Sequence, residues 1–205
     1  MSIFSHRFRS FSLKGFTLIE LTIVFAIITV ISALLLLRQD RFSSTTLLRS
    51  LAYSVALTFR QAQVYGTSVR ESSAGSGLFG KSYGVYFGSG DATRYYLFAD
   101  INNDGARAAD GSEDLPAYVI RNGFSIKKFC GTIASSGTER CSDSGAPITW
   151  LVVYFKRPNP DALFSSSEAL ESYSSAYVEL QGTDGTTRRV TVTNTGQIYV
   201  GALGT

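Results

Sequence analysis

The pattern of apolar residues first marks out a segment near the N-terminus. From Phe16 to Leu37 the side chains are almost continuously apolar, and Glu20 is the only ionisable one among them. A helix of about 22 residues is roughly 33 Å long, which is enough to cross a hydrocarbon core of about 30 Å. The pattern therefore predicts a transmembrane helix over residues 16–37.

From residue 38 to residue 66 the apolar positions recur at spacings of three and four, which is typical of an amphipathic helix. The face expected to pack on a globular domain carries Leu47, Leu51, Val55, Phe59 and Ala62. No proline interrupts the chain before Gly66, which is expected to end the helix. We therefore expect one long helix, and the serine and threonine residues within 41–46 are the place where a break would occur.

After Gly66 the pattern changes to short runs rich in Tyr, Phe, Val and Ile, separated by turn-forming residues. Strands are predicted over 83–87, 94–100, 117–121, 124–129, 148–155, 176–181, 188–193 and 197–200. Hairpin turns are predicted at Asp184-Gly185 and at Asn194-Thr195-Gly196, and the polar stretch 157–175 is predicted to be a loop. Short connections favour antiparallel pairing, so the predicted fold class is α+β, with the long helix packed on an antiparallel sheet of residues 67–205. Most of the tyrosine and phenylalanine residues lie on strands and are expected in the core, as is Trp150, in preference to a stacking platform for sugar or nucleic acid.

Charge indicates the topology of the membrane segment. Arg7, Arg9 and Lys14 precede it without any acidic residue, so the N-terminal end is expected in the cytoplasm and the remainder outside. An ordinary cleaved signal peptide is the alternative, but the apolar run ends in bulky leucines rather than in a small-residue cleavage site. Of 19 basic residues, 16 follow residue 15, and they balance the 16 acidic residues of the same part of the chain. Nucleic acid is therefore not an expected partner.

The supply of reactive side chains limits the chemistry. The single histidine, His6, precedes the membrane segment, so the exported part lacks Ser-His-Asp, Cys-His and His-ligated zinc sites. We expect a protein that is not an enzyme and requires no cofactor. Cys130 and Cys141 are expected to form a disulfide in an oxidising compartment, which would contribute about 3 kcal/mol. Metal binding by these two thiols alone is the weaker interpretation.

One loop resembles the opening of a calcium site. The stretch "DINNDG" would offer oxygen ligands from Asp100, Asn102 and Asp104, with Asp110 closing the cage. Gly111 stands where an EF-hand carries its bidentate glutamate. A turn built from Asn, Asp and Gly explains the same residues and is the favoured interpretation.

Glu20 raises a separate question, because a carboxylate in hydrocarbon costs about 3 kcal/mol on insertion scales. One interpretation places it in the first turns of the helix, near the headgroups and the positive end of the helix dipole. The other gives it a cationic partner. A cut between Gly15 and Phe16 would create an amino group about one helical turn from Glu20, either on the same chain or on a neighbour.

The stretch "KGFTLIEL" (residues 14–21), its short basic leader and the following apolar helix resemble the type IV prepilin signal, shared by type IV pilins and the pseudopilins of type II secretion. This resemblance implies a leader, residues 1–15, which a prepilin peptidase removes after Gly15, followed by N-methylation of Phe16. It implies that Glu20 meets the N-terminal amine of an adjacent pilin or pseudopilin subunit. The chain would be a single-pass protein of the inner membrane, with its C-terminal domain periplasmic or extracellular.

The exported half is similar, less specifically, to the H-type pseudopilin and T-type minor pilin branch. In some minor pilins of that branch a Gly-Arg-x-Arg stretch is associated with DNA uptake, whereas this chain reads Gly196-Gln197-Ile198-Tyr199. Arg188 and Arg189 are the local basic pair, and alternation along a strand separates their faces. DNA capture is thus disfavoured. A pilus subunit, a secretion pseudopilin and a signal-anchored periplasmic binding module that does not polymerise remain as alternatives.

Overall fold

The computed structural model describes residues 15–72, 75–115, 117–168 and 171–202; all but the last residue of the predicted leader 1–15 lies outside them. The chain divides into two compact units, Met1–Phe42 and Ser43–Thr205, which are treated separately below. Among the described residues there is one α-helix, α1 (Leu18–Thr67), which contributes to both units, and there are ten strands.

Helix α1 begins where Thr17 caps it: the backbone N–H of Glu20 donates a hydrogen bond to Thr17 Oγ1 at 3.3 Å. A threonine at this position satisfies one of the backbone donors that a helix start leaves without a partner. The backbone stays helical through residues 41–46, the place considered for a break, and the helix ends one residue beyond Gly66. The prediction of a single long helix is confirmed.

The ten strands form two five-stranded sheets, and every pairing is antiparallel. The first sheet contains, in spatial order, β3 (Tyr118–Val119), β2 (Arg94–Asp100), β1 (Ser82–Gly88), β6 (Trp150–Phe155) and β7 (Ala162–Ser166). The second contains β10 (Ile198–Ala202), β9 (Thr187–Thr193), β8 (Tyr173–Gln181), β4 (Ser125–Ile133) and β5 (Glu139–Cys141). The α+β prediction is confirmed in general terms, with two sheets where one was expected.

Two strands were not predicted from the sequence. The stretch 157–175, predicted to be a loop, contains all of β7 and the start of β8. β7 is an edge strand that pairs only with β6, and burial along it does not follow polarity, because Ser166 is buried whereas Leu163 is 42% exposed. β5 has three residues and pairs with β4 at one edge of the second sheet. Backbone pairing, rather than hydrophobic pattern, defines both strands.

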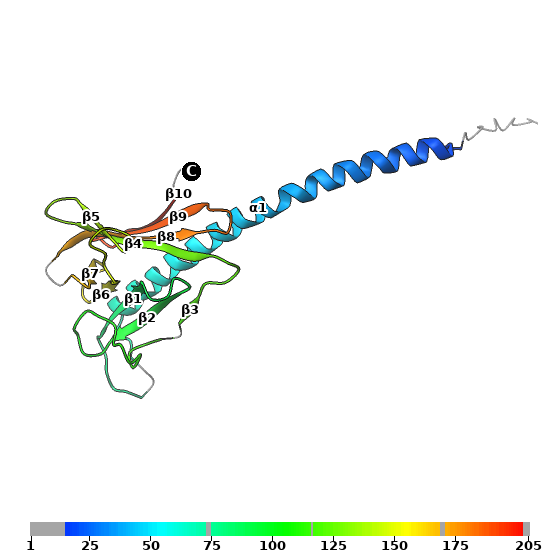
Figure 1. Ribbon diagram of the computed structural model, residues 1–205. Helices are drawn as coiled ribbons and strands as arrows, with labels where there is room; N and C mark the ends of the chain where they lie inside the picture. The colour runs from blue at the N-terminus through cyan, green and yellow to red at the C-terminus, as the bar shows by residue number, and fades with distance from the viewer. Residues whose placement is uncertain (1–14, 73–74, 116, 169–170, 203–205) are drawn as a thin grey trace, which may run out of the picture. The chain divides into compact units, whose positions relative to one another are not determined.

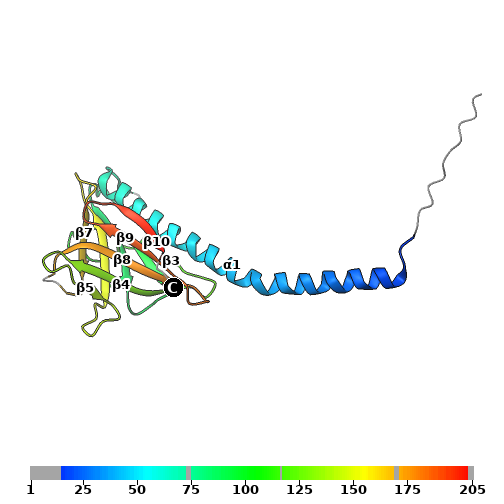
Figure 2. The ribbon, with the colours of Figure 1, turned by 90° about the horizontal axis from the view of Figure 1, so that it is seen from above.

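The core of the unit Ser43–Thr205 lies where α1 meets both sheets. Figure 1 shows the cyan part of α1 between the second sheet above it and strands β1, β2 and β3 below it; Figure 2 shows the strands gathered on one side of this segment. The ring of Phe59 on α1 lies 5.8 Å from that of Phe87 on β1, which lies 6.5 Å from that of Phe129 on β4. All three side chains are buried, so one aromatic chain joins the helix to both sheets.

The face of α1 that packs on the sheets differs slightly from the predicted one. Its buried residues are Leu48, Ala52, Val55, Phe59 and Ala62. Leu47, predicted to belong to this face, is 47% exposed, and Leu51 is only partly buried. Two adjacent leucines satisfy a spacing of three or four almost equally well, and only the position of the sheets decides between them.

Candidate assembly and processing site

The N-terminal part of α1 is an apolar helix with no cover of its own. Residues Leu18–Leu36 have a mean hydropathy of 2.6, and none of this window is buried. By length and composition this helix is able to cross a membrane, and a signal sequence near an N-terminus would have the same properties. The exposure is general: Phe16, Leu18, Leu35 and Leu36 are each more than 60% exposed.

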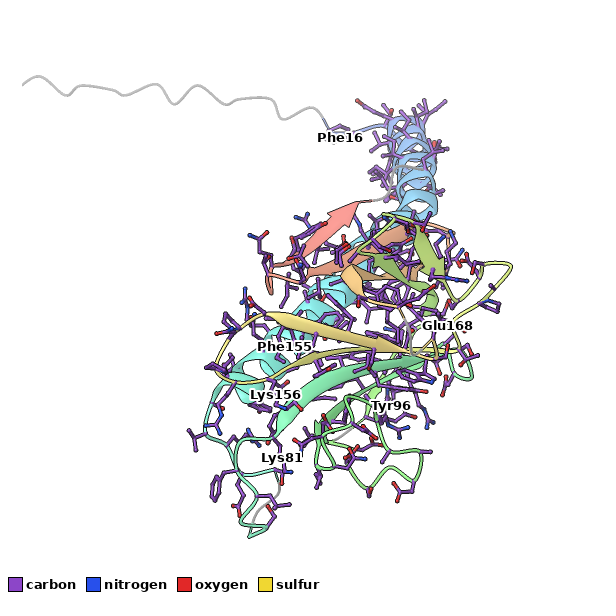
Figure 3. The ribbon with its side chains drawn as sticks, turned by 90° about the vertical axis from the view of Figure 1, so that its left-hand side faces the viewer. Phe16, Lys81, Tyr96, Phe155, Lys156 and Glu168 are labelled. Atoms are coloured by element: carbon purple, nitrogen blue, oxygen red, sulfur yellow. A yellow bond between two sulfur atoms is a disulfide. The ribbon has the colours of Figure 1, made fainter. Side chains whose placement is uncertain are left out.

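The proposed cleavage position lies just before this helix. Gly15, Phe16 and Thr17 are in irregular backbone, and a Cβ atom added at Gly15 would have no atom within 4 Å. Phe16 is 81% exposed and is labelled in Figure 3. The peptide bond between Gly15 and Phe16 is therefore outside the helical hydrogen-bond pattern and accessible, as a peptidase substrate requires.

Glu20 lies in the first turn of α1, and its exposed side chain adjoins the cap formed by Thr17. The spacing Thr17-x-x-Glu20 is that of a capping box, and a carboxylate in the first turn also interacts favourably with the helix dipole. Sequence reasoning assigned the dipole contribution but missed the cap, which the Thr-x-x-Glu spacing indicates. The cap fixes the start of the helix, so Glu20 is presented at a defined position four residues after Phe16.

In the second unit, Gln63 attaches α1 to two loops. Its side-chain Nε2 donates to the carbonyl oxygens of Pro160 at 2.7 Å and Gly196 at 3.1 Å, and Gln63 is buried. A Cβ atom at Gly196 would lie 2.2 Å from the Pro160 oxygen, and its φ of +77° also favours glycine. The contact explains Gly196 structurally. Nothing in the periodicity of α1 distinguishes Gln63 from an exposed polar residue, so sequence reasoning missed it.

Gly66 was predicted to stop the helix, but its role is packing. Its φ is not positive, and the helix continues through Thr67. A Cβ atom at Gly66 would lie 2.3 Å from the backbone oxygen of Phe155, at the end of β6. Figure 3 labels Phe155 and Lys156 where β6 ends, near the cyan end of α1. The glycine therefore allows a strand backbone to approach the helix closely.

The loop after β2 is held down by two buried carboxylates. Asp100 accepts hydrogen bonds from the Ser82 hydroxyl at 2.8 Å and from the backbone N–H groups of Asp104 and Gly105 at 3.0 and 3.1 Å. Asp100 is 1% exposed, so its carboxylate is satisfied by these donors rather than by water.

Glu113 is the second of these carboxylates, and it is 5% exposed. It accepts from the backbone N–H groups of Ile101 at 2.8 Å, Asn102 at 3.3 Å and Ala108 at 3.0 Å. A carboxylate that binds several backbone donors is the usual anchor of an irregular loop, because those donors have no ladder partner. The sequence shows an acidic cluster here and does not indicate which member is buried.

The four candidate calcium ligands take part in turns. Asn102 Oδ1 accepts from the N–H of Asp104, Asp104 Oδ1 accepts from the N–H of Ala106, and Asn102 Nδ2 donates to Asp104 at 2.9 Å. Asp110 accepts from the Ser112 N–H and hydroxyl, which together lower the pKa of its carboxyl group. Among the described residues, the carboxylates of Asp100, Asp104 and Asp110 do not converge within 4.8 Å of one another. The turn interpretation accounts for this geometry, and calcium binding stays a prediction.

Cys130 and Cys141 are opposite each other on β4 and β5 and form a disulfide with an S–S distance of 1.99 Å. A carboxylate oxygen of Glu139 lies within 4.8 Å of both sulfur atoms. Because the two sulfur atoms are bonded to each other, neither is available as a thiolate ligand for a metal ion. The Tyr177 hydroxyl donates to Glu139 Oε2 at 2.6 Å. Burial raises the pKa of Tyr177, and the Glu139 hydrogen bond raises it further. The cluster closes an edge of the second sheet.

The basic pair of β9 is divided between the two faces of its sheet. Arg189 lies over the Tyr177 ring, 3.8 Å from its centroid, and 4.0 Å from a carboxylate oxygen of Glu179. Arg188, the preceding residue on the strand, belongs to the opposite face. No pair of arginines is therefore presented together by β9.

No family model matches the chain, and no curated protein or solved structure matches it. The functional interpretation rests on the residues themselves.

Proposed function

We propose that the chain is a minor pilin or pseudopilin subunit, which assembles through the N-terminal part of α1 into a type IV pilus or a type II secretion pseudopilus. The observation that carries the proposal is one carboxylate, Glu20, on an otherwise apolar and fully exposed helix, next to the accessible Gly15–Phe16 bond. The unit Ser43–Thr205 would be the part presented outside the inner membrane.

The electrostatic argument favours a partner for Glu20. A carboxylate in the hydrocarbon region costs about 3 kcal/mol on insertion scales, and a cation nearby offsets this cost. Cleavage by a prepilin peptidase would place the new amino group on Phe16, and an adjacent subunit would bring its own amine to Glu20. Such a desolvated ion pair would also set the register between neighbouring helices. The Thr17 cap supports this role, because it fixes the backbone of Glu20 at the start of the helix.

The exposure of the helix favours assembly over a solitary anchor only when it is taken together with Glu20. Lipid alone would satisfy the apolar side chains of Leu18–Leu36. A non-polymerising binding module would need no acid in its anchor, whereas a filament subunit would use one. DNA capture is not favoured, because Arg189 is already engaged by Tyr177 and Glu179.

The mass of the N-terminus tests the processing step. When the chain is expressed with a prepilin peptidase, the mature protein is expected to begin with methylated Phe16. Gly15→Leu is expected to leave the leader attached. An intact Met1 start under the same conditions contradicts the proposal and favours the signal-anchored module.

A second experiment tests the ion pair. Glu20→Gln keeps the size of the side chain and removes its charge, and it is expected to allow insertion and cleavage but to abolish incorporation into filaments. Thr29→Ala is the matched control, because Thr29 is another exposed polar residue of the same helix whose hydroxyl bonds only its own helix, at the Phe25 carbonyl. Normal incorporation of the Glu20 variant would argue against the pairing.

A further inference from the structure

The outer face of the first sheet carries aromatic residues that the sequence placed in the core. Tyr86 on β1, Tyr96 on β2 and Trp150 on β6 are each only partly buried. The register pairs Tyr86 with Tyr96, and Trp150 with Gly88. A Cβ atom at Gly88 would lie 2.8 Å from the Tyr86 hydroxyl, so the Tyr86 ring lies over the glycine and next to Trp150. The Tyr86 and Trp150 rings are 23° from parallel, with centroids 6.4 Å apart.

The loop after β2 forms a wall beside these rings. The guanidinium carbon of Arg107 lies 4.1 Å from the Tyr96 centroid and 5.3 Å from the Tyr86 centroid. Figure 3 shows Tyr96 beside this green loop. A hollow of about 400 Å³ opens between loop and sheet, lined by Tyr86, Ala106, Arg107, Ala109 and Trp150. Small-molecule sites have volumes of about 300–1,000 Å³ and combine aromatic walls with a few polar groups.

The charge of the hollow restricts its ligand. Arg107 donates from Nε to Asp114 at 2.6 Å and from Nη2 to the other oxygen of the same carboxylate. This bidentate pair raises the pKa of Arg107 and neutralises its charge locally. An anionic ligand would therefore gain little attraction here. The ring faces would suit a ligand that is apolar on one face, and the guanidinium edge would suit one with hydroxyl groups on its rim.

We propose that the hollow between Trp150, Tyr86 and Arg107 binds a neutral pyranose sugar. The C–H face of the sugar packs on the aromatic rings, and its hydroxyl groups meet the guanidinium N–H groups that Asp114 does not use and the Tyr86 hydroxyl. Among the described residues no hydrogen bond occupies that hydroxyl. Five residues line the hollow, so it matches one ring better than an extended proline-rich segment.

The chain offers a direct probe, because Trp150 is its only tryptophan. The full-length protein is kept in a zwitterionic detergent without a sugar headgroup and is titrated with glucose, galactose or N-acetylglucosamine while Trp150 emission is recorded. We expect a saturable change with at least one sugar. No saturable change with any of them up to about 10 mM, well above a millimolar Kd, overturns the proposal. A response to a proline-rich peptide in place of the sugars overturns it as well.

Variants separate the site from the fold. Tyr86→Ala is expected to weaken sugar binding at least tenfold, and Tyr86→Phe, which keeps the ring and the packing, by a smaller factor. Tyr199→Ala is the matched control, since Tyr199 is 53% exposed on β10 of the other sheet. Equal affinities for the Tyr86 and Tyr199 variants overturn the proposal.

Asp114→Asn tests the charge argument. The substitution leaves the Arg107 charge without its partner, so the preference is expected to shift toward glucuronate, a sugar with a carboxylate. An unchanged preference for neutral sugars, with an unchanged emission spectrum of the free protein, overturns the role of Arg107. These measurements use unassembled protein in micelles, so they are independent of leader cleavage and of Glu20.

Discussion

Helix α1 has two parts, which differ both in apolar content and in what covers them. In the first, Leu18–Leu36, every residue is exposed. In the second, residues 48–64, one stripe from Leu48 to Ala62 is buried under both sheets, while Leu57 and Val64 on the opposite side remain 68% and 53% exposed. The second part thus obtains its apolar environment from its own chain, and the first part must obtain it from lipid or from other helices.

This contrast explains the different use of polar residues. In the covered part, Gln63 is satisfied by two carbonyl groups of the same unit. In the uncovered part, Thr22 and Thr29 donate to carbonyls of their own helix, at 2.8 and 2.7 Å, whereas Glu20 has no cation among the described residues within salt-bridge distance. Unlike the two threonine hydroxyls, the Glu20 carboxylate finds no partner within its own helix, and this difference motivates the proposed pairing with an adjacent subunit.

The largest expected effect comes from opening the covered stripe. Phe59→Ala is expected to destabilise the unit Ser43–Thr205 by about 3–5 kcal/mol, because Phe59 is 2% exposed and joins both sheets through Phe87. Chemical denaturation of the full-length protein, followed by circular dichroism, measures this. Leu57→Ala, two residues away and 68% exposed, should change stability by no more than about 0.5 kcal/mol. Similar losses of stability for both variants would show that Phe59 is not on the buried face of α1 and Leu57 on the exposed one.

The uncovered part should show the reverse behaviour. Val30→Arg places a charge at a position that is 61% exposed and is expected to cost about 2.5–3.5 kcal/mol in membrane insertion. The denaturation midpoint of the unit Ser43–Thr205 should not change. Membrane fractionation and denaturation of the same preparation test both statements. A variant that inserts normally, or that unfolds the globular unit, would remove the distinction between the two parts.

The sequence predicts the helix well, because a long period of three and four without proline has few other solutions. It does not show which residues of that helix are buried, since Leu47 and Leu48 fit the period equally well and tertiary packing buries Leu48. It misses β7, a short edge strand whose residues do not alternate between apolar and polar and which is recognised by its backbone pairing with β6.

The candidate site divides in the same way. The Gly15–Phe16 bond and Glu20 belong to one local string of residues, so the sequence alone is enough to predict them. Trp150, expected in the core, lies on the outer face of the first sheet, because side chains alternate along β6 and Leu151 and Val153 face the core. Its partner Gly88 leaves room beside it for the Tyr86 ring. A contact that joins distant segments in this way has no local signal.

A smaller effect is expected at Gly66, where two contributions have opposite signs. Helix propensity alone predicts that Gly66→Ala stabilises α1 by about 1 kcal/mol. The added Cβ atom would lie 2.3 Å from the Phe155 backbone oxygen, and overpacking of this kind costs about 1–3 kcal/mol. Because a strand backbone yields less readily than a side chain, we expect net destabilisation. Gly145→Ala, where a Cβ atom would meet nothing within 4 Å, is the control in the same denaturation experiment. Stabilisation by Gly66→Ala would show that β6 does not pack closely against α1 at this residue.

The smallest effect lies at Ser44, a buried residue at the start of the second unit, whose hydroxyl is 3.4 Å from that of Thr183 in the β8–β9 turn. The pKa of the neighbouring Asp184 is lowered chiefly by the Thr186 hydroxyl and N–H, with a smaller contribution from Ser44. A lowered pKa stabilises the turn above the pKa of the unfolded chain, and this contribution is lost as the pH falls through the folded value. Thr186→Val should therefore raise the Asp184 pKa most and Ser44→Ala should raise it slightly, as measured by carboxyl NMR titration. If Ser44→Ala leaves the pKa of Asp184 unchanged, the packing of the β8–β9 turn on α1 does not reach Ser44, and the buried part of the helix begins nearer to Leu48.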